Sequence, residues 1–269
     1  MRVGILTSND LRHRYLVNAL ARRFEVAAVG YQDTGYSPIT VADDAPDEPT
    51  AELVRRHFDE RRRQEERYFG HDAGRFADNG RGTAIDLDVR SLNSPETVRF
   101  LDERNVDVVV VYGTSLIKPP LLTRFAGRLI NMHLGLSPYY RGTATNFYPL
   151  VNGEPQYVGA TIHLIDAGID SGPIVHHARP DIVAHDGPHT VGCKAILAGI
   201  EALSRALTEF EAGRMETVPQ WPAANSKLYL RRDYRSSHVV QLYEQIASGL
   251  FSKYAERRVR VEHAIRLID

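Results

Sequence analysis

The first thirty residues contain the feature that most limits how this chain can fold. The segment RVGILT is a short apolar run, LRHRYLVNALARRF has apolar residues at helical spacing, and EVAAVGY is apolar again. A strand, a helix and a second strand within roughly 30 residues form the repeating unit of a parallel sheet. A later run, VDVVVVY, is apolar at nearly every position, which is typical of strands buried on both faces. The sequence therefore predicts an α/β fold with a mostly parallel sheet.

Periodicity and capping residues predict the further elements. A helix over 50–69 has Thr50 as its expected N-cap, and one over 94–105 has Ser94 as cap and Pro95 in its first position. Two strands, over 157–166 and 173–182, are close enough in sequence to pair antiparallel. The remaining predictions are a short helix near 121–125, a strand over 127–133, a long helix over 189–212, a helix over 237–254, and irregular segments over 32–49 and 70–82.

Charge and cysteine content exclude several classes of function. The 33 Lys and Arg residues nearly balance the 34 Asp and Glu residues, so bulk charge predicts no nucleic-acid partner. Cys193 is the only cysteine in the sequence, which excludes an internal disulfide and a cysteine-cluster metal site. His176 and His177 are adjacent and would point to opposite sides of a strand, so we expect no metal.

The distribution of apolar residues predicts where the protein is found. No run of ~18 apolar residues is present, and the opening apolar run is too short for the core of a signal peptide. We therefore expect a cytoplasmic protein that is not associated with a membrane.

Polar side chains gather on two neighbouring predicted strands. Asn131 and His133 share one face at the carboxyl end of a strand, where open α/β sheets bind their ligands. His163 lies on a following strand, and Asp170 lies on the glycine-containing turn after it. An amide, imidazoles and a carboxylate at one place suit a reaction that develops an oxyanion while a proton moves. Each residue alone has a structural explanation, as a strand cap, an interior histidine or a turn residue.

The same residues resemble those of a known family. The segments NMHLGLSPYYRG and VGATIHLIDAGIDSGPIV, together with VVVYGTSLIKPPLL, resemble the folate-dependent formyltransferase domain shared by glycinamide ribonucleotide, methionyl-tRNA and sugar-nucleotide N-formyltransferases. The resemblance covers residues 1–212 and is strongest over 106–182. It implies a Rossmann-like parallel sheet flanked by helices. It also implies 10-formyltetrahydrofolate as formyl donor and a substrate amine that attacks the formyl carbon through a tetrahedral intermediate.

The resemblance also implies roles for individual residues. Asn131 and His133 would stabilise the oxyanion, and Asp170 would sustain the charge on His133 and help to move the proton. The residues implied in binding the folate are Ser115, Leu116 and Ile117 on one side, and His163 and Asp166 on the other. Arg141 matches a loop motif and either contacts the substrate or braces the loop.

Other features bear on the identity of the acceptor amine. Arg12 and Arg14 follow the first strand on the ligand side of the sheet, where we expect them to contact a phosphate of the substrate. The first strand lacks the glycine-rich turn of the glycinamide ribonucleotide enzymes. We expect a catalytic domain over 1–212 and a C-terminal extension with a helix over 213–269. Residues 219–269 are too few for the C-terminal barrel of the tRNA enzymes.

The preferred hypothesis is an N-formyltransferase whose acceptor is an amino sugar linked to a nucleotide. Alternatives are formylation of an amino acid or hydroxylamine in a biosynthetic pathway, or of methionyl-tRNA. An alternative from another class is a catalytically inactive regulator that binds folate or a nucleotide. The sequence leaves open the acceptor, its nucleotide content, the role of residues 32–90 and whether the protein is a homodimer.

Overall fold

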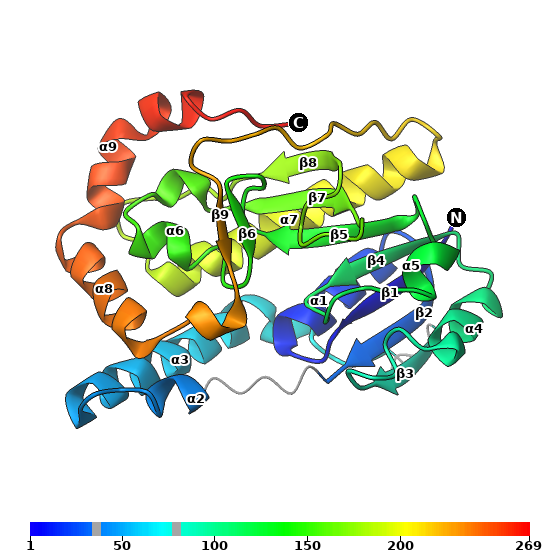
Figure 1. Ribbon diagram of the computed structural model, residues 1–269, viewed down its shortest axis with the longest axis horizontal. Coiled ribbons are helices and arrows are strands. Elements are labelled where there is room, and N and C mark those ends of the chain that lie inside the picture. Colours follow the sequence, from blue (N-terminus) through cyan, green and yellow to red (C-terminus); the bar gives the residue numbers. More distant parts are fainter. Residues whose placement is uncertain (34–38, 77–81) are drawn as a thin grey trace.

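A seven-stranded sheet forms the centre of the protein (Figure 1). The computed structural model describes residues 1–33, 39–76 and 82–269. The strand order is β3-β2-β1-β4-β5-β7-β8, in which the first five strands are parallel and β7 and β8 are antiparallel to their neighbours. This confirms the predicted mostly parallel sheet and the antiparallel pair. The strands are β1 (Arg2–Ser8), β2 (Glu25–Gln32), β3 (Thr83–Leu87), β4 (Val108–Tyr112), β5 (Leu129–Leu134), β7 (Ala160–Leu164) and β8 (Ile174–Ala178).

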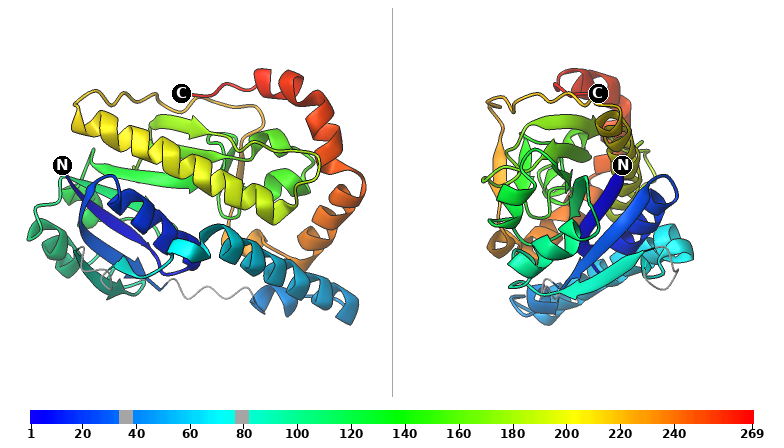
Figure 2. Two further views of the ribbon diagram at one scale, coloured as in Figure 1. Left: turned by 180° about the vertical axis from the view of Figure 1, so that it is seen from behind. Right: turned by 90° about the vertical axis from the view of Figure 1, so that its right-hand side faces the viewer.

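Helices cover both faces of this sheet, because its central strands are apolar on both sides. The helices α1 (Leu11–Ala21) and α7 (Pro188–Glu211) pack on one face, against side chains that include Val108 and Val110. The helices α4 (Pro95–Asp102) and α5 (Leu121–Arg124) pack on the other face, against Val109 and Val111. Successive valines of β4 thus alternate between two cores, and Figure 2 shows the resulting three layers. The Rossmann-like expectation is confirmed.

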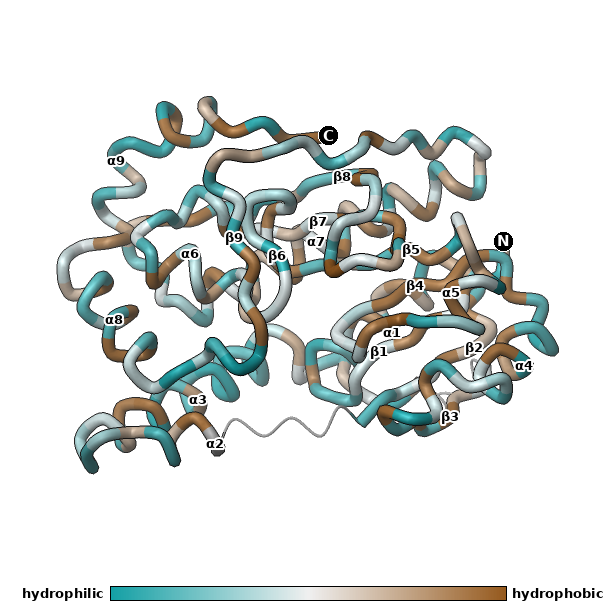
Figure 3. The backbone as a smooth tube through the Cα atoms, viewed as in Figure 1, coloured by the Kyte–Doolittle hydropathy of each residue, from teal (hydrophilic) through white to brown (hydrophobic). Residues whose placement is uncertain are grey.

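The helix α3 (Glu48–Phe69) begins slightly earlier than predicted. Its N-cap is Asp47, whose carboxylate accepts a hydrogen bond from the Thr50 N–H at 2.8 Å, so the prediction of Thr50 as cap is wrong. Figure 3 shows that α3 is hydrophilic along much of its length, and its buried residues form a single stripe that includes Val54 and Phe58. The cap predicted for α4 is confirmed, because Ser94 accepts from the Thr97 N–H.

The C-terminal part contains two helices where one was predicted. The helices are α8 (Ser236–Ala247) and α9 (Leu250–His263). They are separated at Gly249, whose φ of 86° is left-handed and cannot continue a right-handed helix. The single helix predicted over 237–254 is therefore wrong.

The short elements were harder to predict. The strands β6 (Tyr140–Gly142) and β9 (Lys227–Tyr229) form a two-stranded parallel sheet that was not predicted, and neither was β3. The segment expected to be irregular over 32–49 contains α2 (Ile39–Ala42), and part of it lies outside the described residues, as does part of 70–82. The remaining short elements are α6 (Tyr148–Val151) and the 3-10 turns η1 (Gly70–Asp72), η3 (Pro155–Tyr157) and η4 (Arg231–Asp233). In the described part of the chain, no helix combines the length and apolarity needed to cross a membrane.

Candidate active site

The pairing of β5 with β7 brings two of the predicted residues face to face. Asn131 lies opposite His163 in the antiparallel register, and His133 lies opposite Thr161. Nδ2 of Asn131 is 3.0 Å from Nε2 of His163. The other ring nitrogen of His163, Nδ1, is 2.8 Å from the Leu164 carbonyl oxygen, which can only accept. Nδ1 of His163 therefore carries the proton, and Nε2 accepts the hydrogen bond from Asn131.

Asp170 completes the group from the turn between β7 and β8. Its Oδ1 is 3.4 Å from Nδ2 of Asn131 and 3.6 Å from Nε2 of His163. Its Oδ2 is 3.3 Å from Nδ1 of His133 and accepts from the Gly142 N–H at 2.9 Å. Burial opposes ionisation of Asp170, but the charge of His133 and the hydrogen bonds hold the pKa of Asp170 well below the usual carboxyl range. Asp170 is therefore an anion at neutral pH.

His133 lies between two hydrogen-bond acceptors. Its Nδ1 faces Asp170, and its Nε2 is 3.0 Å from the carbonyl oxygen of Tyr140. An imidazole can donate to both only when both nitrogens are protonated. Burial lowers the pKa of His133, while the Asp170 carboxylate and the Tyr140 carbonyl act in the opposite direction. Burial outweighs these two contacts, so the pKa of His133 stays below its ordinary value, and the contacts reduce the cost of protonating the imidazole.

The segment after β4 is held in place by two residues that the sequence analysis did not identify. Gln32, at the end of β2, accepts from the Ser115 N–H at 2.7 Å and donates to the Ser115 hydroxyl at 3.1 Å. Asn93 donates to the Leu116 carbonyl at 2.9 Å and accepts from the Lys118 N–H at 2.7 Å. The available sequence signal for Gln32 was a polar residue directly after an apolar strand, and the structure buries this glutamine completely.

Both segments predicted to bind folate are next to residues of one apolar cluster. Ile117 is buried in an apolar cluster, and Ile165, just before the Asp166 turn, packs against that same cluster. Leu116 is 53% exposed and so presents an apolar side chain at the surface beside this cluster. The Asp166 carboxylate accepts from the Gly168 N–H and the Ser171 hydroxyl, at 2.9 and 2.8 Å, so it closes its own turn.

The three predicted substrate-binding arginines have different surroundings. The Arg12 guanidinium lies 2.9 and 3.1 Å from the two carboxylate oxygens of Glu65, and both side chains are mostly buried. These contacts give Arg12 a structural partner, and its contact with a phosphate of the substrate stays a prediction. Arg14 and Arg141 form no ion pair with any residue that the structure describes, and each has a buried Nε without a hydrogen-bond partner.

One residue of the C-terminal segment also contacts the candidate site. Gln220 donates from Nε2 to the backbone carbonyls of Asp170 and Gly172. No sequence signal pointed to it, because it is distant in the chain and belongs to no periodic element. Cys193 is buried, which raises the pKa of its thiol to about 12. Within the described ranges, no cluster of three or more His, Cys, Asp or Glu side chains could hold a metal ion.

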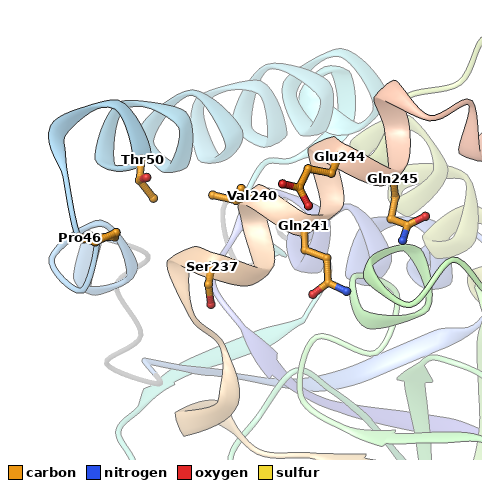
Figure 4. Close-up of a pocket in the computed structure, with 7 residues that line it drawn as sticks. All are labelled: Pro46, Thr50, Ser237, Val240, Gln241, Glu244 and Gln245. Atoms are coloured by element: carbon orange, nitrogen blue, oxygen red, sulfur yellow. The ribbon is translucent and has the colours of Figure 1, made fainter.

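A cavity of about 590 Å³ lies elsewhere, between the start of α3 and α8 (Figure 4). Its lining includes Thr50, Val240 and Gln241, and none of the predicted site residues contributes to it. The predicted residues therefore form a site independent of this cavity.

Comparisons with known proteins place this geometry in context. Residues 50–207 match the family model described as formyl transferase. Methionyl-tRNA formyltransferase from Synechocystis sp. is 33% identical over 127 residues, which cover 46% of this chain and 38% of that protein. The match thus spans about two fifths of the length of this curated relative.

Solved structures share the fold over most of the chain. A sugar N-formyltransferase from Shewanella sp. has a TM-score of 0.57 at 18% identity, covering 91% of this chain and 87% of that one. Phosphoribosylglycinamide formyltransferase from Anaplasma phagocytophilum has a TM-score of 0.56 at 16% identity, covering 86% and 98%. At such low identity these similarities concern the fold alone.

Proposed function

This chain belongs to the formyl transferase family, and on that premise we propose that it transfers a formyl group from 10-formyltetrahydrofolate to a small primary amine. The observation that carries the proposal is the Asp170 carboxylate, which contacts Asn131, His133 and His163 at once. Formyl transfer to an amine needs stabilisation of a negative oxygen and removal of a proton from the amine. The four side chains supply groups for both tasks.

Each residue has a role that follows from its contacts. The Asn131 N–H that makes only a long contact of 3.4 Å to Asp170 is available to donate to a developing oxyanion. His133, between Asp170 and the Tyr140 carbonyl, can take up a proton and then contributes positive charge beside that oxygen in the transition state. Asp170 maintains this charge and assists the proton on its way from the amine to the leaving nitrogen. His163 orients the Asn131 amide.

The residues present fit a folate donor, which would supply the activated formyl group when bound. Leu116 offers an exposed apolar side chain to a flat ring, and the backbone from Ser115 to Ile117 is fixed by Gln32 and Asn93. A rigid backbone segment of this kind binds polar ring edges without loss of conformational freedom. We propose that Ser115, Leu116 and Ile117 bind one side of the pterin and that the turn from Asp166, together with His163, binds the other.

For the acceptor, we propose an amino sugar linked to a nucleotide. Arg14 and Arg141 are cations without ion-pair partners in the described chain, and they suit the phosphates of such a substrate. Methionyl-tRNA, and an amino acid or hydroxylamine, are the alternative acceptors.

The test is to incubate the protein with 10-formyltetrahydrofolate and a panel of amines, and to detect products by mass spectrometry. The panel contains nucleotide-linked amino sugars, free amino sugars, amino acids, hydroxylamines and methionyl-tRNA. We expect a mass gain of one formyl group on a nucleotide-linked amino sugar, dependent on the donor and on His133. Folate binding without a formylated product from any amine would instead support a regulator that has lost catalysis.

A further inference from the structure

A segment outside the predicted catalytic domain contacts the turn that carries Asp170. Nε2 of Gln220 lies 2.7 Å from the carbonyl oxygen of Asp170 and 2.9 Å from that of Gly172, and it donates to both. We propose that Gln220 is a positioning residue, which holds Asp170 in the orientation that its carboxylate needs. This inference rests on the proposed function, because it assigns Gln220 to the same reaction.

The backbone of Asp170 needs such support. Its φ of 47° lies in the left-handed region, which is unfavourable for a residue with a side chain. The preceding Ala167 and Gly168 are exposed, so the turn has little packing of its own on that side. Both carboxylate oxygens of Asp170 have separate partners, and a rotation of its backbone would move both of them together. Gln220 bonds to the backbone on both sides of Ser171 and opposes this rotation.

Gln220 itself is fixed on both sides. Two residues before it, Val218 exchanges hydrogen bonds of 2.8 Å in both directions with Ile174, the first residue of β8. Directly after it, Trp221 stacks beneath the Arg266 guanidinium, 4.2 Å from the ring centroid. The carbonyl Oε1 of Gln220 is buried without a hydrogen-bond partner, so the two donated bonds determine how the amide is oriented. The side chain therefore connects the Asp170 turn to a rigid part of the sheet edge.

A purely structural role and a positioning role predict different measurements. If Gln220 only stabilised the turn, its loss would lower the melting temperature and leave the titration of His133 unchanged. If it positions Asp170, its loss weakens the contact between Asp170 and His133. The Asp170 charge raises the pKa of His133, so this pKa should then fall.

The experiment compares three variants with the wild-type chain. Gln220→Met keeps the length of the side chain and removes the donor. Gln241→Met is the matched control, because Gln241 also donates to a backbone carbonyl, that of Val151, but belongs to α8. Asp170→Asn gives the full effect of removing the carboxylate charge. The measurements are the pKa of His133 by NMR without any ligand, the melting temperature, and kcat and KM for formyl transfer.

We expect the pKa of His133 to fall in Gln220→Met relative to Gln241→Met, in the direction of Asp170→Asn. We also expect kcat to fall by about tenfold or more, because small displacements of a catalytic group are costly, while KM for the donor stays nearly constant. A His133 pKa equal in the two methionine variants would overturn the proposal. If Gln220→Met does not fold, Gln220→Asn, which keeps the amide but shortens its reach, undergoes the same measurements. If the wild-type chain forms no formylated product, the proposed function fails, and the NMR comparison still decides the role of Gln220.

Discussion

Oδ2 of Asp170 lies 3.3 Å from Nδ1 of His133, where His133 belongs to β5 and Asp170 to the turn between β7 and β8. The antiparallel register of β5 and β7 carries the chain back past His133, and the left-handed turn at Asp170 points its carboxylate inward. Because Asp170 is an anion and His133 has an acceptor on each side, this pair stabilises positive charge on the imidazole. The predictions about catalysis follow from this pair.

Replacing either member of the pair should reduce turnover much more than stability. We expect His133→Ala and Asp170→Asn each to lower kcat by on the order of 10²-fold or more, because each group acts on the transition state. Steady-state kinetics with a formyl acceptor measure this. His176→Ala is the control. His176, on β8, is also buried, but its partner is Glu209 on α7. Near-normal turnover of folded His133→Ala would falsify the assigned role.

The sequence allowed prediction of the part of the site that follows strand geometry. Alternation along a strand placed Asn131 and His133 on one face, and the short connection predicted that β7 and β8 are antiparallel. Gly142 and Gln220 could not be predicted, because their contacts depend on β6, a three-residue strand, and on a non-repetitive segment. Segments this short have no periodicity to detect.

The arginines show a different limit of sequence reasoning. Because Arg12 and Arg14 both follow β1, sequence reasoning places both on the ligand side of the sheet and predicts the same phosphate contact for each. Only the packing of α3 against α1 reveals that Glu65 meets Arg12. The sequence of α3 contains nearly equal numbers of Arg and Glu residues, and it does not indicate which of these side chains point into the protein.

Folate should stabilise the protein in the absence of any acceptor. A ligand that binds only the folded state adds to the free energy of unfolding by mass action, by about 2.7 kcal/mol at a ligand concentration of 100 times Kd. The melting temperature rises as a result. We expect a thermal shift with 5-formyltetrahydrofolate, a stable analogue of the donor, and a smaller one in Leu116→Ser. Val259→Ser is the control, because Val259 is an exposed apolar residue on α9. An absent response at millimolar ligand would count against the proposed folate site.

The pair of Arg12 and Glu65 should matter for stability. Removing one member of a mostly buried ion pair leaves the other charge without a partner, at a cost of about 3 kcal/mol. We therefore expect Arg12→Met to lower the free energy of unfolding by an amount of this order in denaturant titrations. The double variant with Glu65→Gln should recover part of the loss. A single variant as stable as the wild-type chain would show that the pair is not structurally important.

Acid should destabilise the fold through two buried histidines, one on α3 and one on α7. The rings of His57 and His189 lie 4.4 Å apart, and burial lowers their pKa values to about 2 and about 3. Both bind a proton more readily when the chain is unfolded, so stability is complete above about pH 6.5 and falls as pH decreases toward 3. We expect a slope of about 1.4 kcal/mol per pH unit for each histidine. His189→Phe should make the pH dependence less steep, and an unchanged slope would contradict the assignment.

Two measurements distinguish a nucleotide-linked sugar from methionyl-tRNA as acceptor: the KM of arginine variants and the salt dependence of binding. Arg14→Ala and Arg141→Ala should chiefly raise the acceptor KM, since each removes binding that is equal in the ground and transition states. Arg22→Ala is the control, because Arg22 is occupied by Asp72. For methionyl-tRNA, binding should instead weaken steeply with salt, as many phosphate contacts release counterions. Efficient formylation of methionyl-tRNA with such a salt dependence would exclude the nucleotide-linked sugar as the preferred substrate. An unchanged acceptor KM in both arginine variants would exclude a role of Arg14 and Arg141 in binding the substrate.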